Sequence, residues 1–134
     1  MSQTPLSKFL QEKITQINLD RLHWNQNHPD EKPRPLATDA ELAEASHVPI
    51  ATFSRWRLGQ GMPTDFDRVA ALAQVLSDYG GEEIFRVVGM QERVPSDLAW
   101  LITNAGKPEI KRILDEAIRE ARELKGNGPT PALT

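Results

Sequence analysis

Apolar side chains recur at helical spacing through most of the chain. In residues 5–24 they stand mainly three or four positions apart, so one face of a helix would collect them. The same spacing returns in residues 66–76 and 98–105. From residue 110 to residue 124 the steps are four, three, four and three, which makes a seam of two heptads. Because no segment gives a convincing strand pattern, we predict an all-α fold.

Caps and breakers divide this pattern into separate helices. Thr38 followed by Glu41 is a capping box, and Thr64 followed by Asp67 repeats it with a shorter acid. Three prolines within residues 25–37 predict an extended loop, because proline lacks an amide donor and restrains the residue before it. The glycines that we expect to end helices are Gly59, Gly61, Gly80, Gly81 and Gly106.

Composition limits the class of protein. The chain has 134 residues, of which 39% are hydrophobic and 26% charged, and this size fits one domain with at most an appendage. The absence of cysteine excludes disulfides, thiolate metal sites and cysteine catalysis. No apolar stretch approaches the roughly 18 residues that a membrane span needs. Residues 1–13 lack the basic start and apolar core of a secretory signal, so we expect a cytoplasmic protein with no membrane contact.

Charge is distributed unevenly along the chain. The formal net charge is −3, so any contact with nucleic acid needs a local basic patch. Between Glu44 and Asp65 there is no acidic residue, whereas His47, Arg55 and Arg57 fall inside that window. One interpretation is a basic surface for nucleic acid; the other is a pair of solvated arginines on an ordinary surface helix.

Residues 38–58 predict two helices joined by a sharp turn. Two helices cross steeply only where the residue at the crossing is small, and Ala43 is placed to be that residue. The second helix would then face outward, with its N-terminus free to approach phosphate. The apolar residues expected to be buried beneath the pair are Leu42, Val48, Phe53 and Trp56.

The segment "TDAELAEASHVPIATFSRWRLGQGMPT" resembles the λ-repressor/Cro (XRE) family of helix-turn-helix DNA-binding domains along its whole length. Thr38 stands at the cap position, and Gly59 and Pro63 stand at the family's distances from it. The resemblance covers about residues 5–90 and implies five helices. A lengthened loop and a helical C-terminal dimerisation region are similar to the layout of EspR-type regulators.

The resemblance implies a particular organisation. Residues 1–90 would form the DNA-binding domain, with the proline-rich loop at 25–37. Residues 91–125 would form the helical dimerisation region, and residues 126–134 a disordered tail.

The chain departs from the family pattern at several points. His47 stands where the family usually has the turn glycine, which would place a non-glycine residue in the left-handed region. Asp39 replaces a frequent glutamine, and Arg57 occupies a position that is often glutamate. The loop before Thr38 is longer than usual; it either folds against the domain or brings Lys32 and Arg34 to DNA.

The family pattern assigns base readout to the start of the second helix. Ile50 and Ala51 occupy the first two exposed positions, where apolar groups can pack on a thymine methyl group. Arg55, one turn later, would then hydrogen-bond a base, most plausibly guanine, and Arg57 would contact phosphate or form an internal ion pair. Thr52, Ser54 and Gln60 are the phosphate candidates. The full set of predicted DNA-binding residues is Pro49, Ile50, Ala51, Thr52, Ser54, Arg55, Arg57 and Gln60.

The C-terminal seam has to pack on something, because a helix so apolar on one side is not stable alone. It would pack either on its own domain or on a second copy of the chain, and we predict a homodimer. The residues predicted to form the dimer contact are Leu98, Leu101, Ile110, Leu114, Ala117, Ala121 and Leu124.

Other residues that could suggest chemistry have structural explanations. We expect the three tryptophans, Trp24, Trp56 and Trp100, to fill the core or an interface. The three histidines lack a spacing that suits a metal, and no nucleophile–base pair or phosphate-binding glycine loop is present. We therefore expect no enzyme activity, no metal and no cofactor.

The leading hypothesis is a sequence-specific transcriptional regulator that binds pseudopalindromic DNA as a dimer. The alternatives are a protein-interaction module, such as an antitoxin or adaptor, and an architectural DNA-binding protein. Both would use the same fold.

Overall fold

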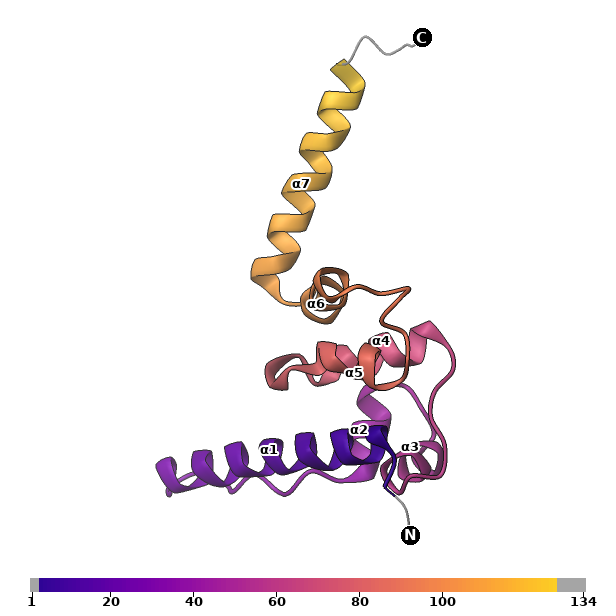
Figure 1. Ribbon diagram of the computed structural model, residues 1–134. Coiled ribbons are helices and arrows are strands. Elements are labelled where there is room, and N and C mark those ends of the chain that lie inside the picture. Colours follow the sequence, from indigo (N-terminus) through magenta and orange to yellow (C-terminus); the bar gives the residue numbers. More distant parts are fainter. Residues whose placement is uncertain (1–2, 128–134) are drawn as a thin grey trace. The chain divides into compact units, whose positions relative to one another are not determined.

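The computed structural model describes residues 3–127, and all regular structure within them is helical (Figure 1). The all-α prediction is therefore confirmed. The helices are α1 (Pro5–Asn27), α2 (Asp39–Ala45), α3 (Ile50–Arg57), α4 (Phe66–Val75), α5 (Ile84–Val87), α6 (Ser96–Asn104) and α7 (Pro108–Asn127), with the 3₁₀ turns η1 (Ser77–Tyr79) and η2 (Gly81–Glu83) between α4 and α5.

The chain divides into two compact units between Thr103 and Asn104. The first unit holds α1 to α6 and the second holds α7. The side chain of Ala99 in α6 is buried in the core of the first unit, and the amide of Gln74 donates a hydrogen bond to the carbonyl of Ile102 (3.3 Å). The first compact unit thus extends to residue 103, beyond the predicted domain boundary at residue 90, because α6 packs with the helices before it.

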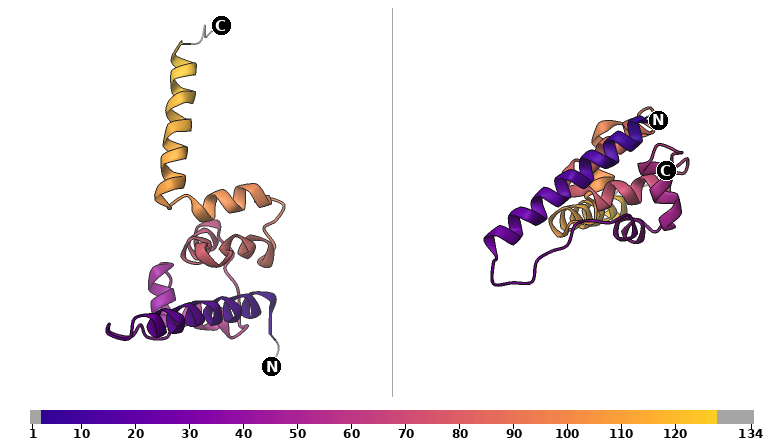
Figure 2. Two further views of the ribbon diagram at one scale, coloured as in Figure 1. Left: turned by 90° about the vertical axis from the view of Figure 1, so that its left-hand side faces the viewer. Right: turned by 90° about the horizontal axis from the view of Figure 1, so that it is seen from below.

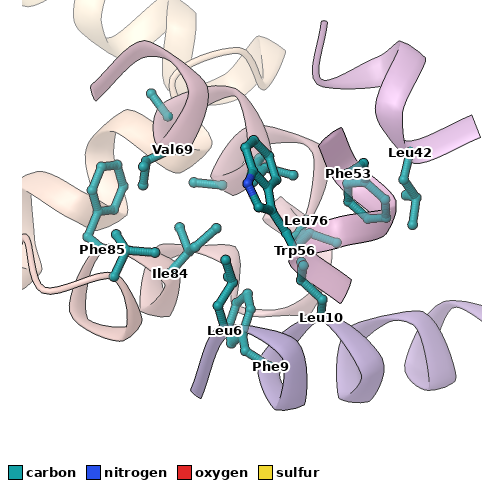
Figure 3. Close-up of a cluster of buried hydrophobic side chains, with 14 of the residues drawn as sticks. Leu6, Phe9, Leu10, Leu42, Phe53, Trp56, Val69, Leu76, Ile84 and Phe85 are labelled. Atoms are coloured by element: carbon teal, nitrogen blue, oxygen red, sulfur yellow. The ribbon is translucent and has the colours of Figure 1, made fainter. Parts of the chain in front are cut away.

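One hydrophobic core joins the helices of the first unit. Figure 3 shows side chains from α1, α3, α4 and α5 converging on one cluster, with Trp56 near its centre. Trp56 and Phe53 are 4% and 1% exposed, as the sequence predicted. Trp100 is 46% exposed, so of its two predicted roles, in the core or in an interface, the structure does not show the first. The core residues that Figure 3 labels are Leu6, Phe9, Leu10, Leu42, Phe53, Trp56, Val69, Leu76, Ile84 and Phe85.

Side-chain caps start α2 and α4. The hydroxyl of Thr38 accepts a hydrogen bond from the amide of Glu41 (3.1 Å), as the capping-box pattern predicted. For α4 the prediction of Thr64 was wrong. Asp65 is the cap residue, and its carboxylate accepts from the amide of Arg68 (3.3 Å). Both residues suit a cap chemically, and α4 begins one residue later than the pattern suggested.

The proline-rich segment folds against α1. We call residues 28–37 the strap; it leaves the C-terminal end of α1 and returns beside it toward α2 (Figure 2). The side-chain amide of Asn25 makes two hydrogen bonds to the backbone of Arg34, at 2.7 and 3.1 Å. Asn18 accepts from the amide of Ala37 (2.8 Å), and Arg21 donates to the carbonyl of Pro35 (3.2 Å). The face of α1 therefore supplies hydrogen-bond partners to an extended chain that has few of its own.

The same contacts decide between the two predictions for the loop. The guanidinium carbon of Arg34 lies 3.8 Å from the centre of the Trp24 ring, a cation–π contact on the far part of α1. The strap folds against its domain, which is the first of the two predicted alternatives. Leu22, which the helical pattern placed on the buried face, is 48% exposed, and Trp24 is only half-buried.

His47 is the one non-glycine residue of the described chain with a positive φ, at 60°. It follows α2, and its amide donates to the carbonyl of Glu44 (3.1 Å), while the amide of Val48 donates to that of Ala43 (2.9 Å). These two bonds form a Schellman motif, whose left-handed position usually holds glycine. The prediction that residue 47 is a non-glycine residue in the left-handed region is thus confirmed.

The left-handed position gives a test of the turn. His47→Gly should raise the free energy of unfolding by about 1 kcal/mol, because glycine removes the steric cost of an L-residue there. His47→Ala is the control, since it removes the imidazole and keeps the cost. Urea denaturation of the three proteins measures the effect, and equal stabilisation by both variants would show that the imidazole, and not the backbone, is responsible.

Candidate nucleic-acid interface

One face of α3, the second of the two crossing helices, packs into the core. Phe53 and Trp56 are three residues apart and both are buried, so they hold the inner side of α3 in the core. Ala43 on α2 is fully buried, and its small side chain lets the two helices approach. The side-chain amide of Gln11 on α1 donates to the carbonyl of Arg57 (3.1 Å), which fixes the C-terminal end of α3.

The outer side of α3 carries the residues that remain exposed. Ile50 is 54% exposed, and Ala51 and Arg55 are exposed with it. These three positions fall at i, i+1 and i+5 of one short helix. Pro49, in extended backbone conformation, is the N-cap residue, and Gln60 is exposed beyond the C-terminal end. Ala51 and Arg55 stand one turn apart on the same side of α3, whereas Ile50 lies about 140° around the helix from Arg55, at the N-terminal edge of the exposed surface.

A hydrogen-bond network ties the start of α2 to α3. Arg57 donates from Nε to Oδ1 of Asp39 (2.7 Å) and from Nη2 to Oδ2 (2.8 Å), and the hydroxyl of Ser54 donates to Oδ2 (2.7 Å). We call these three residues the Asp39 network. Such a bidentate contact is the strong form of an arginine–carboxylate pair. The hydrogen bond from Arg57 lowers the pKa of Asp39, and that from Ser54 lowers it further, against the effect of burial.

The network assigns two of the predicted phosphate-binding candidates to internal contacts. Ser54 and Arg57 both contact Asp39, so the internal ion pair is the alternative that the structure has for Arg57. Thr52 is half-buried. The Asp39 carboxylate faces α3 and its two arginine hydrogen bonds compensate its charge.

Arg55 differs from Arg57 in its surroundings. Within α3, all of which the structure describes, Arg57 contacts a carboxylate, whereas Arg55 contacts the carbonyl of Ala51 on its own helix (Nε to O, 3.4 Å). The positive charge on the outer face of α3 is therefore that of Arg55.

Exposed apolar side chains around α3 were not predicted from the sequence. Leu58 is 45% exposed and Met62 is 47% exposed, next to the end of α3 in the chain. The sequence carried no periodicity there, because the segment between α3 and α4 is irregular. An internal ion pair was one of the two alternatives predicted for Arg57, but Asp39 was not identified as its partner.

Comparisons with known proteins add nothing to this geometry: no family model, no curated protein and no solved structure matches the chain. Among residues 3–127, no helix has the length and apolar character that crossing a membrane requires. The same part of the chain holds no cluster of three or more His, Asp or Glu side chains able to bind a metal ion.

The Asp39 network predicts a pH-dependent contribution to stability. The pKa of Asp39 is lower in the folded chain than its ordinary value of 3.8, so the contribution is fully present above that value and is lost as the pH falls through the folded-state pKa. Asp39→Asn should lower the free energy of unfolding by about 1–2 kcal/mol at neutral pH. The difference between the two proteins should shrink in acid.

Glu44→Gln is the matched control, because Glu44 is an exposed carboxylate on the same helix. Urea denaturation at several pH values from neutral to acid measures the three proteins. A difference between wild type and Asp39→Asn that stays constant down to pH 2 would show that the network contributes nothing through its charge.

Proposed function

We propose that the protein is a sequence-specific DNA-binding transcriptional regulator of the λ-repressor/Cro (XRE) type, which places α3 in the major groove and binds as a homodimer. In this proposal α2, the turn at His47 and α3 form the helix-turn-helix. The observation that carries it is the combination of a buried inner face and an exposed outer face on α3, with Ile50, Ala51 and Arg55 on the outside.

The residues then have separate roles. Arg55 hydrogen-bonds guanine, the base edge best matched to a guanidinium group, and Ile50 with Ala51 packs on a thymine methyl group. Gln60 and the exposed backbone amides at the start of α3 contact phosphate. Ser54 and Arg57 act as positioning residues through Asp39, since their side chains already contact that carboxylate.

A protein-interaction module, such as an antitoxin or adaptor, is the second candidate. The exposed apolar side chains of Ile50, Leu58 and Met62 favour it, because apolar surface on a small domain often marks a contact with another protein. The formal net charge of −3 is also compatible with it. The protein-interaction module gives no role to the exposed charge of Arg55.

One titration separates the candidates. The purified protein is mixed with fragments of genomic DNA at several salt concentrations, in the presence of competitor DNA. A regulator should retain a few fragments as salt rises, because base contacts survive when phosphate contacts weaken. Simultaneous loss of all fragments would indicate an architectural protein, and no shift of any fragment would favour the protein-interaction module.

Arg55→Ala tests the reading role directly. On a retained fragment it should weaken binding by roughly 10- to 100-fold and remove the preference at one base pair, because a bidentate arginine–guanine contact is worth about 1–3 kcal/mol. The fold should be unchanged, since Arg55 is exposed.

Arg86→Ala is the control for this variant, because it removes an exposed arginine from the same unit but not from α3. Binding of each variant is measured to a panel of fragments with single base-pair changes, and circular dichroism checks the fold. If Arg55→Ala keeps the base preference of the wild type, Arg55 does not read a base.

A further inference from the structure

The second unit contains one helix, and that helix has an apolar seam. In α7 the exposed fractions of Ile113, Ile118 and Leu124 are 56%, 49% and 74%. A single helix has no neighbour inside its own unit to cover such a seam, and a helix of 20 residues is marginal alone in water. The residues that flank the seam indicate what covers it.

The seam follows a heptad pattern. Leu114 and Ala121 take the a positions, and the d positions are Ile110, Ala117 and Leu124. The flanking g positions are then Ile113 and Glu120, and the flanking e positions are Lys111, Ile118 and Lys125. Side chains at e and g decide the orientation of two paired helices, because they meet across the seam.

A parallel pair matches these flanking residues. In that arrangement each g residue meets the e residue five positions later in the other copy. Ile113 would meet Ile118, and Glu120 would meet Lys125. Two-fold symmetry repeats both contacts, so the pair gains two apolar contacts and two ion pairs of opposite charge.

In an antiparallel pair of α7 helices, the flanking residues are not complementary. Two antiparallel registers keep most of the seam in contact, with g meeting g and e meeting e. One sets Ile113 against Glu120 and Lys111 against Ile118, so an apolar group meets a charge each time. The other sets Ile118 against Ile118, which is an apolar contact, but it also sets Glu120 against Glu120 and Lys111 against Lys125, so like charges meet.

We propose that α7 forms a parallel two-stranded coiled coil with α7 of a second copy of this chain. The inference rests on the homodimer of the proposed function and adds its geometry: both first units are attached at the same end of the pair. The alanines at two of the seam layers leave room for close approach of the helices but little apolar area. The pair should therefore be weak and sensitive to its flanking charges.

Disulfide trapping tests the orientation, because the chain has no cysteine of its own. Ala121→Cys changes the side-chain volume little, and a parallel pair brings the two new thiols to the same layer. Mild oxidation of the full chain should give a covalent dimer on a non-reducing gel. Leu124→Cys is the second variant and should behave alike. Arg119→Cys is the control, because its position lies on the opposite face of α7 and should cross-link far less.

Mixing identifies the other orientation. Ile110→Cys and Ala121→Cys proteins of different tag length are oxidised together. Covalent homodimers of each support the parallel pair, and a dominant cross-link between the two variants would overturn it in favour of the antiparallel arrangement. Monomers throughout, with no cross-link above the Arg119→Cys control, would also overturn it, since the seam would then be paired in the second antiparallel register or covered by the protein's own first unit or by another protein.

Charge exchange gives an independent readout. Glu120→Lys should raise the dimer dissociation constant roughly tenfold, because two attractive pairs become repulsive. The double variant Glu120→Lys with Lys125→Glu should return it close to the wild-type value. Sedimentation equilibrium measures both, and failure of the double variant to recover would overturn the pairing of these two residues.

These outcomes are separate from those of the proposed function. A dimer that cross-links through Ala121→Cys but shifts no DNA fragment leaves the parallel pair standing and removes the DNA-binding role. A monomer that retains specific fragments removes the parallel pair and leaves the role of α3.

Discussion

The close packing of α2 against α3 is the constraint on which the rest of the first unit depends. Ala43 of α2 is fully buried, so a larger side chain there would disturb the packing of this helix. Phe53 and Trp56 then reach the core from α3. Asp39 completes the arrangement from the other end of α2, where its carboxylate binds Ser54 and Arg57. Apolar packing thus holds the inner face of α3 in the core, and the Asp39 network fixes the orientation of α3 relative to α2.

Local signals explain why much of this architecture was predictable. The cap at Thr38, the small residue at position 43 and the non-glycine turn at His47 each depend on residues within a few positions of one another. Periodicity likewise identified Phe53 and Trp56 as core residues. The start of α4 was predicted one residue too early, since Asp65 and not Thr64 is its cap residue. The sequence did not separate the two because both side chains can accept a hydrogen bond from a helix amide.

Contacts between distant parts of the chain were not predictable. Asp39 and Arg57 are 18 residues apart in the sequence and meet only because the two helices cross. The docking of the strap on α1 depends on Asn18, Arg21 and Asn25, which the helical pattern marked only as polar surface. The membership of α6 in the first unit was missed for the same reason, since Ala99 has no sequence neighbour that indicates its burial.

The ion pair between Asp39 and Arg57 also limits how this chain can diverge. The two charges compensate each other only when both residues are present. A lineage that changed Asp39 alone would leave a guanidinium group unpaired at the helix crossing, and one that changed Arg57 alone would leave a carboxylate there. A change at one of the two positions is therefore tolerated best when the other position changes with it.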